Sequence, residues 1–413
     1  MRNRLTAIIL LAALALCLCG CGSIFEKEYL VVEDYVPAAQ QEISTGEKVT
    51  VKNFSALKQA IQRFVSEGRE EGTIIFDSDY SGNTSEDLAS ACWQIRTQNA
   101  LCAYCVENIS YDVSRIVAHD EAEVRISYAD FGGKMGDIVR LSFSTGVDEL
   151  ILNALTESDN KLEMYILNGT YTAEGMENLV AQVYHTYPVC TPMEPKVKVN
   201  VYSGTGMQRL YEIDFNYGMS EEELEACRGE LAALDVLAEL DTDSMDPGQK
   251  ALAACVYLTE NCEKTEEAKD NNAYSVLIRR CGNSEGLALA YVELCRELGL
   301  SCGIVYGQKD WESHCWNIVT VSGSSYHVDV SECIENGMQN GFFLNDQSMW
   351  GHYRWDISSY ASCTGELTYA QVAGLPETVL QTSENDKAAE DQAPDESPAE
   401  EETPEEGQKE KEE

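Results

Sequence analysis

Residues 287–298 form a run that is apolar on nearly every side when it is placed on a helix. A surface helix carries one apolar stripe, whereas a helix that is apolar all round is buried on most of its surface. Gly299 ends the run, because glycine tolerates the left-handed conformation in which many helices stop. The segment 300–306 then has the composition of a strand that leaves the turn. The chain must therefore place other elements around this helix.

Two segments farther along, 314–319 and 325–330, alternate apolar and polar residues as paired antiparallel strands do. Before the buried run, helical patterns extend from 220 to about 239 and from 247 to 261. Helices combined with antiparallel strands indicate an α+β domain. We therefore expect the buried helix to pack against an antiparallel sheet.

Three motifs in this region carry a resemblance to the transglutaminase-like superfamily. They are Ser-Glu-Gly-Leu-Ala at 284–288, which opens the buried helix, His-Cys-Trp-Asn at 314–317 and Tyr-His-Val-Asp at 326–329. The segments 341–346 and 352–356 are similar to the segment that closes the family's domain. The resemblance covers roughly Ser220 to Ser362. It implies a papain-like Cys-His-Asp core, which we place at 220–370.

The resemblance assigns roles to three positions of this sequence. His314 takes the place of the general base, and Asp329 takes the place of the residue that orients it. The family's nucleophile is a cysteine at the helix N-terminus, where the helix dipole and a neighbouring imidazolium stabilise the thiolate. This chain departs from the pattern, since Ser284 stands at that position and Leu287 replaces the usual tyrosine. A serine hydroxyl is a weak nucleophile until a base removes its proton.

Three interpretations of Ser284 follow from this departure. Ser284 can be only the N-cap of the helix, because serine oxygens accept early helical N–H groups. It can be the nucleophile of a serine triad with His314 and Asp329, a grouping that recurs on unrelated folds. Alternatively Cys281, which should precede the helix, supplies the thiol. His314 and Asp329 can also persist only as a hydrogen-bonded pair that joins two strands.

The first half of the chain shows one order of elements twice. The first copy is predicted to have helices at 54–67 and from Thr84 onward, capped by Ser85 or Thr84, and strands at 72–76, 106–113 and 123–128. The second is predicted to have helices at 148–155 and 174–185 and strands at 162–167, 197–202 and 209–215. This order suggests two repeated α/β modules, 49–135 and 136–219. Neither holds a catalytic constellation, because His119 and His185 are isolated in the sequence, so we expect the modules to space, position or bind.

The N-terminus has the features of a bacterial lipoprotein signal peptide at 1–20. Two arginines precede an apolar run from Leu5 to Leu18, which is too short to cross a bilayer comfortably, since a membrane helix needs roughly 20 residues. The run ends in a Leu-Cys-Gly-Cys sequence similar to a lipobox. We expect lipid on Cys21 to hold the chain to the outer face of the cell membrane, with a linker at 21–48.

The net charge of −42 excludes general nucleic-acid binding, because a polyanion would be repelled and no basic patch is visible in the sequence. Part of this charge is concentrated at the end of the chain. Residues 381–413 carry 14 acidic side chains against three lysines, with three prolines and no aromatic residue. Such a segment cannot bury enough apolar surface to fold, and we expect 371–413 to be an acidic disordered tail.

Of the 16 cysteines, 13 lie beyond the position that we expect to be lipidated, and an odd number cannot pair completely within the chain. Cys255, Cys295 and Cys315 occupy apolar patterns, where cysteine behaves as a small hydrophobic residue. Cys102 and Cys105 have CxxC spacing, but no second pair follows at the spacing of a zinc site. No acidic loop matches an EF-hand. The sequence implies no metal and no cofactor.

Two functions remain open from the sequence. The first is a membrane-anchored surface lipoprotein whose transglutaminase-like domain is catalytically degenerate and binds a peptide or a cell-wall polymer. The second is an active hydrolase or acyltransferase that acts on amide bonds through Ser284, His314 and Asp329. The serine favours the first function, whereas the retained histidine and aspartate favour the second.

Overall fold

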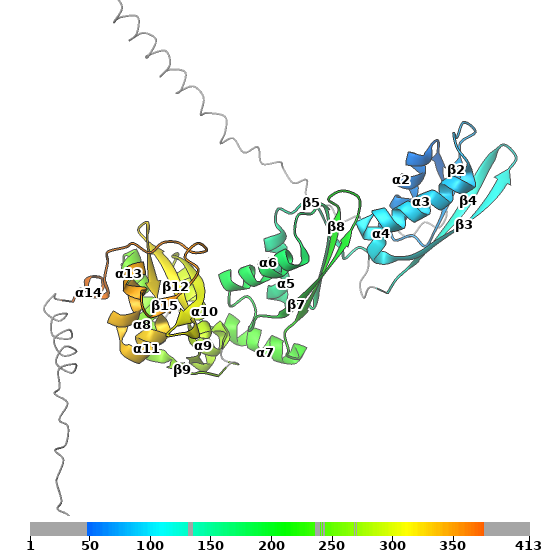
Figure 1. Ribbon diagram of the computed structural model, residues 1–413. Helices are drawn as coiled ribbons and strands as arrows, with labels where there is room; N and C mark the ends of the chain where they lie inside the picture. Colours follow the sequence, from blue (N-terminus) through cyan, green and yellow to red (C-terminus); the bar gives the residue numbers. More distant parts are fainter. Residues whose placement is uncertain are drawn as a thin grey trace, which may run out of the picture.

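The computed structural model describes residues 48–375, except 131–134, 236–239, 241, 243, 268 and 270. The predicted signal peptide, the lipid site Cys21, nearly all of the linker and the acidic tail from 376 onward lie outside the described residues. Within them, three units follow one another along the chain and in space (Figure 1). No helix of the described part combines the length and the apolar character that crossing a membrane requires.

The first unit is a four-stranded sheet with helices packed on it. Its elements are β1 (Lys48–Val51), α2 (Phe54–Ser66), β2 (Glu71–Phe76), α3 (Thr84–Gln98), α4 (Ala100–Cys105), β3 (Val106–Ile116) and β4 (His119–Tyr128). The strand order is β1-β2-β4-β3, with β1 and β2 parallel and the other pairs antiparallel. The five elements predicted from the sequence are confirmed, and α4 and β1 are additional.

The second unit has the same strand order and the same strand directions. Its elements are β5 (Val139–Phe143), α5 (Val147–Glu157), β6 (Lys161–Asn168), α6 (Ala173–Thr186), β7 (Lys196–Ser203) and β8 (Arg209–Asn216). The sheet order is β5-β6-β8-β7, with β5 parallel to β6. The five predicted elements are confirmed, and β5 is additional. The origin of both units in a duplication stays a prediction.

The start of α3 differs from the prediction. Its N-cap is Asn83, whose side chain accepts the N–H groups of Ser85 and Glu86, so neither Ser85 nor Thr84 is the cap. Asparagine and serine are about equally favoured at N-caps, so preference alone does not choose between neighbouring polar residues.

The third unit packs helices against a five-stranded antiparallel sheet. Its helices are α7 (Glu221–Ala232), α8 (Pro247–Asn261), α9 (Ala273–Arg279), α10 (Ser284–Glu297), α11 (Val330–Asn336), α12 (Met338–Gly341), α13 (Asp346–Met349) and α14 (Tyr369–Val372). Its strands are β9 (Glu263–Lys264), β10 (Cys281–Gly282), β11 (Ser301–Lys309), β12 (Glu312–Val321), β13 (Ser324–Val328), β14 (Phe342–Leu344) and β15 (Tyr353–Arg354). The sheet order is β14-β13-β12-β11-β15, and β9 pairs with β10 separately. The helix predicted to reach 239 ends earlier, at Ala232.

The central helix of this unit is α10, as the apolar run predicts. Every residue from Gly286 to Cys295 is buried, including the charged Glu293. Gly299 follows the helix with a φ of +73°, which is the left-handed conformation expected of a glycine that stops a helix. The helix packs against α8, α9, β11 and β12, so its N-terminal end is held from several sides.

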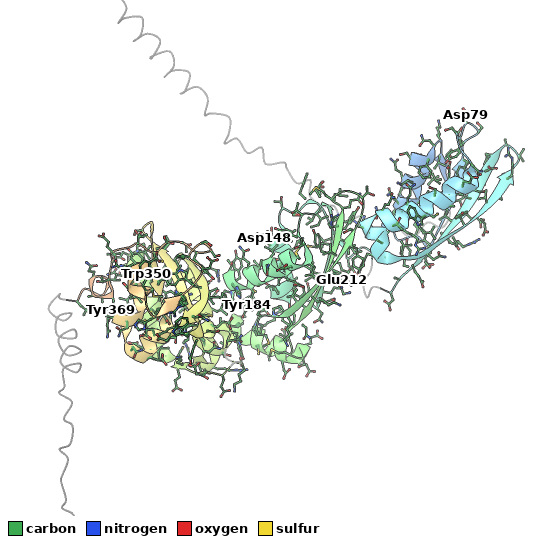
Figure 2. The ribbon with its side chains drawn as sticks, viewed as in Figure 1. Asp79, Asp148, Tyr184, Glu212, Trp350 and Tyr369 are labelled. Atoms are coloured by element: carbon green, nitrogen blue, oxygen red, sulfur yellow. The ribbon has the colours of Figure 1, made fainter. Side chains whose placement is uncertain are left out.

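One hydrophobic core continues from the second unit into the third. It joins Val183 and Tyr184 of α6 to Leu294 of α10, and Figure 2 places Tyr184 where the two units meet. The first unit has a core of its own, to which Leu210 of β8 contributes. The second unit is therefore part of the wall around α10 rather than a separate spacer.

The 13 cysteines of the described residues all carry free thiols, and ten of them are buried. Cys255, Cys295 and Cys315 are buried, and Cys255 and Cys295 belong to the core shared by the second and third units, as expected of small hydrophobic residues. Cys102 and Cys105 lie in α4, inside the core of the first unit. Burial raises the pKa of the Cys105 thiol to about 12, so this CxxC pair has little thiolate at neutral pH.

Candidate active site

The N-terminus of α10 is capped by Asn283. Its side-chain oxygen accepts the N–H groups of Glu285 and Gly286, each at 3.0 Å. Ser284 is the first residue of the helix, so the prediction that Ser284 is the N-cap is wrong. The reason is that Asn283 has the extended backbone of a cap, with φ −80° and ψ −177°, and supplies the oxygen itself. The hydroxyl of Ser284 is left for another role.

Removing the cap oxygen is expected to destabilise the protein more than removing the neighbouring hydroxyl. Asn283→Ala should lower the free energy of unfolding by about 1–2 kcal/mol, because two N–H groups lose their acceptor at the central helix. Ser284→Ala, the matched control, should change it by less than about 0.5 kcal/mol. Urea unfolding of both variants measures the difference. Equal losses would contradict the assignment of the cap.

The structure brings His314 and Asp329 together, as the resemblance implies. Nε2 of His314 lies 2.7 Å from Oδ2 of Asp329. The same oxygen accepts the hydroxyl of Tyr353 at 2.8 Å, and Oδ1 accepts the N–H of Glu332 at 2.9 Å, so Asp329 also caps α11. The Asp329 side chain is 1% exposed and that of His314 is 10% exposed. The histidine is thus oriented by a buried carboxylate whose two oxygens both accept hydrogen bonds.

The carboxylate of Asp329 stays ionised in this environment. Burial raises its pKa, but the hydrogen bond and positive charge of His314, together with the N–H of Glu332 and the hydroxyl of Tyr353, outweigh burial and lower it. An ionised partner stabilises a histidine that takes up a proton. The structure thus places an ionised carboxylate against the imidazole of His314.

Ser284 lies beside this pair. Its Oγ accepts the backbone N–H of Cys315, the residue after His314, at 3.4 Å. Within the described residues, the hydroxyl makes no hydrogen bond to His314, and Nδ1 of His314 has no partner. The three positions named by the resemblance therefore lie close together in the structure. Among the described residues, however, no hydrogen bond joins the Ser284 hydroxyl to the imidazole of His314.

Two cysteines, Cys281 and Cys315, lie near the N-terminus of α10. Cys281 lies in β10 before the helix, as predicted, where its backbone pairs with Glu263 of β9. Cys315 is buried, and burial raises the pKa of its thiol to about 12, with Glu285 and Asp329 adding to the shift. A thiol with that pKa is mostly protonated at neutral pH.

Sequence reasoning missed two parts of the site. Tyr353 lies 24 residues beyond Asp329 in a two-residue strand, which gives no periodic signal. His185, predicted to be isolated, is not: its Nε2 lies 2.9 Å from the hydroxyl of Tyr306, and that hydroxyl donates to Oε1 of Glu285 at 3.1 Å. These contacts join the end of α6 to the start of α10, and no pattern within either segment predicts them.

A second His–Asp pair lies behind the first. Nδ1 of His327 accepts the indole N–H of Trp316 at 3.0 Å, and Nε2 lies 2.9 Å from Oδ1 of Asp346. Cys363 Sγ is also close, since the three potential ligand atoms lie within 4.8 Å of one another. An indole only donates, so Nδ1 carries no proton and the neutral ring must carry it on Nε2. A histidine binds a metal through an unprotonated nitrogen, and neither nitrogen of His327 is free for that role. We therefore interpret this cluster as a group of hydrogen bonds that supports the sheet.

This buried histidine is expected to make stability depend on pH. Burial lowers the pKa of His327, and Asp346 only partly offsets the effect. Below the ordinary imidazole pKa of about 6.5, the unfolded chain therefore binds a proton that the folded chain does not. As the pH is lowered through this range, the free energy of unfolding decreases by at most about 1.4 kcal/mol per pH unit. Urea unfolding at pH 7 and 5.5 should show a weaker pH dependence in His327→Gln than in the natural protein. His119→Gln is the control, and equal slopes in all three proteins would contradict the expectation.

Comparison with known families finds one matching family model. The model of the transglutaminase-like superfamily matches residues 235–330, a stretch that contains Ser284, His314 and Asp329. The chain contains a transglutaminase-like superfamily domain. No curated protein matches the sequence.

Three solved structures are similar to parts of the chain at low identity. One is a TGase, with 10% identity, 56% of this chain and 67% of that chain covered, and a TM-score of 0.25. Another is a protein from Cytophaga hutchinsonii assigned as a cysteine protease, with 11% identity, 33% and 62% covered, and a TM-score of 0.22. The third is a protein from Parabacteroides distasonis assigned as a protease, with 9% identity, 62% and 39% covered, and a TM-score of 0.20. The chain thus spans less than two thirds of the second and third structures.

Proposed function

We propose that this protein is a surface lipoprotein whose transglutaminase-like cleft binds a peptide or a cell-wall polymer without cleaving it. The observation that carries the proposal is Ser284 at the position of the nucleophile, with no hydrogen bond to His314 among the described residues. A site built for a thiolate loses most of its activity when a hydroxyl replaces the thiol, because the hydroxyl is not ionised by the same surroundings. His314 and Asp329 then have a structural role, in which they maintain the shape and the polarity of the cleft.

Anchoring to the outer face of the cell membrane is the second part of the proposal. The support is the sequence at the N-terminus, where an apolar run from Leu5 to Leu18 is followed by the lipobox-like residues that end at Cys21. A lipid on Cys21 would present the three units to material outside the cell. In that case the protein would be attached to the membrane only through this lipid.

A serine acyl enzyme is the second candidate, and two observations favour it. Asn283 caps α10, so Ser284 is not needed as the cap, and His314 is held by an ionised carboxylate. In that reaction Oγ of Ser284 attacks an amide carbonyl while Nδ1 of His314 takes its proton. The histidine then gives the proton to the leaving amine, and water or a second amine releases the acyl group.

Turnover of amide substrates separates the two candidates. The full-length protein, Ser284→Ala and His314→Ala would be incubated with a mixture of peptides and cell-wall fragments, and a fluorophosphonate probe would be followed by intact-protein mass spectrometry. The proposal expects equal background hydrolysis in all three proteins and no labelling of Ser284. Labelling of Ser284 that disappears in His314→Ala, with hydrolysis lost in both variants, would overturn it in favour of the serine acyl enzyme.

A further inference from the structure

A cleft of about 310 Å³ lies between α6 of the second unit and β11 of the third. One face of α6 lines it on one side, a stretch of β11 lines it on the other, and Tyr360 completes the lining. Ten residues line the cleft, among them Gln182 and His185 of α6 and Cys302, Gly303, Ile304 and Tyr306 of β11. The volume is at the small end of the range for ligand pockets, about 300–1,000 Å³, so it fits a short stretch of ligand.

The β11 side of this cleft is an open strand edge. On that edge β15 pairs only with Gln308 and Lys309, and no other described strand pairs there. The N–H of Tyr306 points outward, because it donates to the hydroxyl of Tyr360 at 3.1 Å. Since the direction alternates along a strand, the N–H and C=O groups of Cys302 and Ile304 point to the same side. These groups are a template for an added strand.

The α6 side of the cleft is polar, and its one titratable side chain, His185, lies 3.6 Å from the carboxylate of Glu194. Asn178, Ala181, Gln182 and His185 have the spacing of one helix face, and two of them offer amide donors and acceptors. None of the ten lining residues is Asp, Glu, Lys or Arg, although the chain has 71 acidic and 29 basic residues. The cleft is thus matched to an uncharged ligand that makes amide hydrogen bonds.

One end of the cleft is joined to the start of α10 through Tyr306. The hydroxyl of Tyr306, at that end, bonds both His185 and Glu285, the residue after Ser284. Tyr306 also lies opposite Cys315 in the sheet, and the N–H of Cys315 bonds Ser284. These contacts join one end of the cleft to Glu285, the residue after Ser284.

We propose that this cleft binds an uncharged peptide segment in extended form, as a strand added to β11 under α6. The inference rests on the proposed function and deepens it, since it names the class of ligand and the surface that holds it. The main-chain groups at Cys302 and Ile304 bind the peptide backbone, and the amides of α6 bind its polar side chains. The second unit is then the wall that selects the ligand.

The test uses capped hexapeptides and the full-length protein in isothermal titration calorimetry. One probe is an acetylated and amidated Ala-Thr repeat, the second carries two glutamates, and the third has N-methyl groups on alternate amides, which remove strand hydrogen bonds. Gly303→Leu and Ala181→Leu fill the cleft, and a Cβ at Gly303 meets no atom within 4 Å, so the fold tolerates it. Gly229→Leu is the matched control, because that glycine is exposed on α7 with equally open surroundings.

The neutral peptide is expected to bind the natural protein and Gly229→Leu with equal affinity. Its affinity for Gly303→Leu and for Ala181→Leu should be at least about tenfold lower. The glutamate and N-methyl peptides should bind the natural protein about tenfold more weakly as well. Absence of binding to the natural protein, or binding indifferent to Gly303→Leu or to N-methylation, would overturn the inference. Hydrolysis by the natural protein with cleft binding intact would instead reject only the non-catalytic function, so the two failures are distinguishable.

Discussion

Ser284→Cys is expected to create the most reactive thiol of the protein. The new sulfur would lie at the first position of a 14-residue helix, where the dipole favours an anion, and beside His314 with its ionised partner Asp329. Both effects lower the pKa of a thiol and raise the thiolate fraction at neutral pH. Alkylation of the new thiol by iodoacetamide at pH 7 should be about a hundredfold faster in Ser284→Cys than in the double variant Ser284→Cys/His314→Ala.

Peptide mapping by mass spectrometry measures this rate site by site. The natural protein supplies an internal control, since the half-buried Cys281 lies three residues away outside the helix and should react slowly in every variant. A new thiol that reacts no faster than Cys281, or that is indifferent to His314→Ala, would mean that the surroundings of a thiolate are not preserved. Fast alkylation of the new thiol that depends on His314 would show that replacing the serine oxygen with sulfur is enough to create a reactive nucleophile at this site.

Asp329→Ala is expected to cause the largest loss of stability of any single change in the site. The substitution leaves His314, the hydroxyl of Tyr353 and the N–H of Glu332 without their acceptor, and all three residues are buried or half-buried. Removing one partner of a buried charged pair costs about 3–5 kcal/mol. Because the folded pKa of Asp329 is lowered, its contribution is present above the ordinary carboxyl pKa and is lost as the pH falls toward the folded value.

Urea unfolding at pH 7 measures the loss, and two variants make it specific. Asp112→Ala removes a carboxylate that pairs with Arg125 at 2.6 Å but is 72% exposed, so it should change the free energy of unfolding by less than about 1 kcal/mol. Asp329→Asn keeps an oxygen for the cap of α11 and should lose less than the alanine variant. A loss in Asp329→Ala no larger than in Asp112→Ala would show that the pair does not stabilise the sheet.

The second unit changes how the site is understood. Its helix α6 shares a core with α10 and supplies His185 to the contacts around Glu285. In the proposed function this unit is part of the binding site, and the first unit extends the molecule away from it. Tyr104 of the first unit reaches Glu212 of the second at 3.0 Å, and Figure 2 places Glu212 at that boundary.

Patterns local in the chain could be predicted from the sequence. The buried helix α10, the alternating strands β12 and β13 and most elements of the first two units follow from apolar periodicity, because a side chain's burial repeats with the geometry of its own element. The motifs around Ser284, His314 and Asp329 named a family, and the superfamily model matches the region that holds them. Cap positions were less certain, since Asn283 and Ser284 are adjacent and equally suited to the role.

The sequence by itself therefore determined most of the elements, the buried helix, the strongly negative charge and the residues that could stand in a catalytic triad. Only the tertiary structure decided that Tyr353 completes the hydrogen bonding of Asp329 and that His185 meets Tyr306 across 121 positions of the chain. The physical reason is range. Periodicity reports which face of an element is buried, whereas a hydrogen bond between distant segments depends on how whole faces dock, and no short segment encodes that alone.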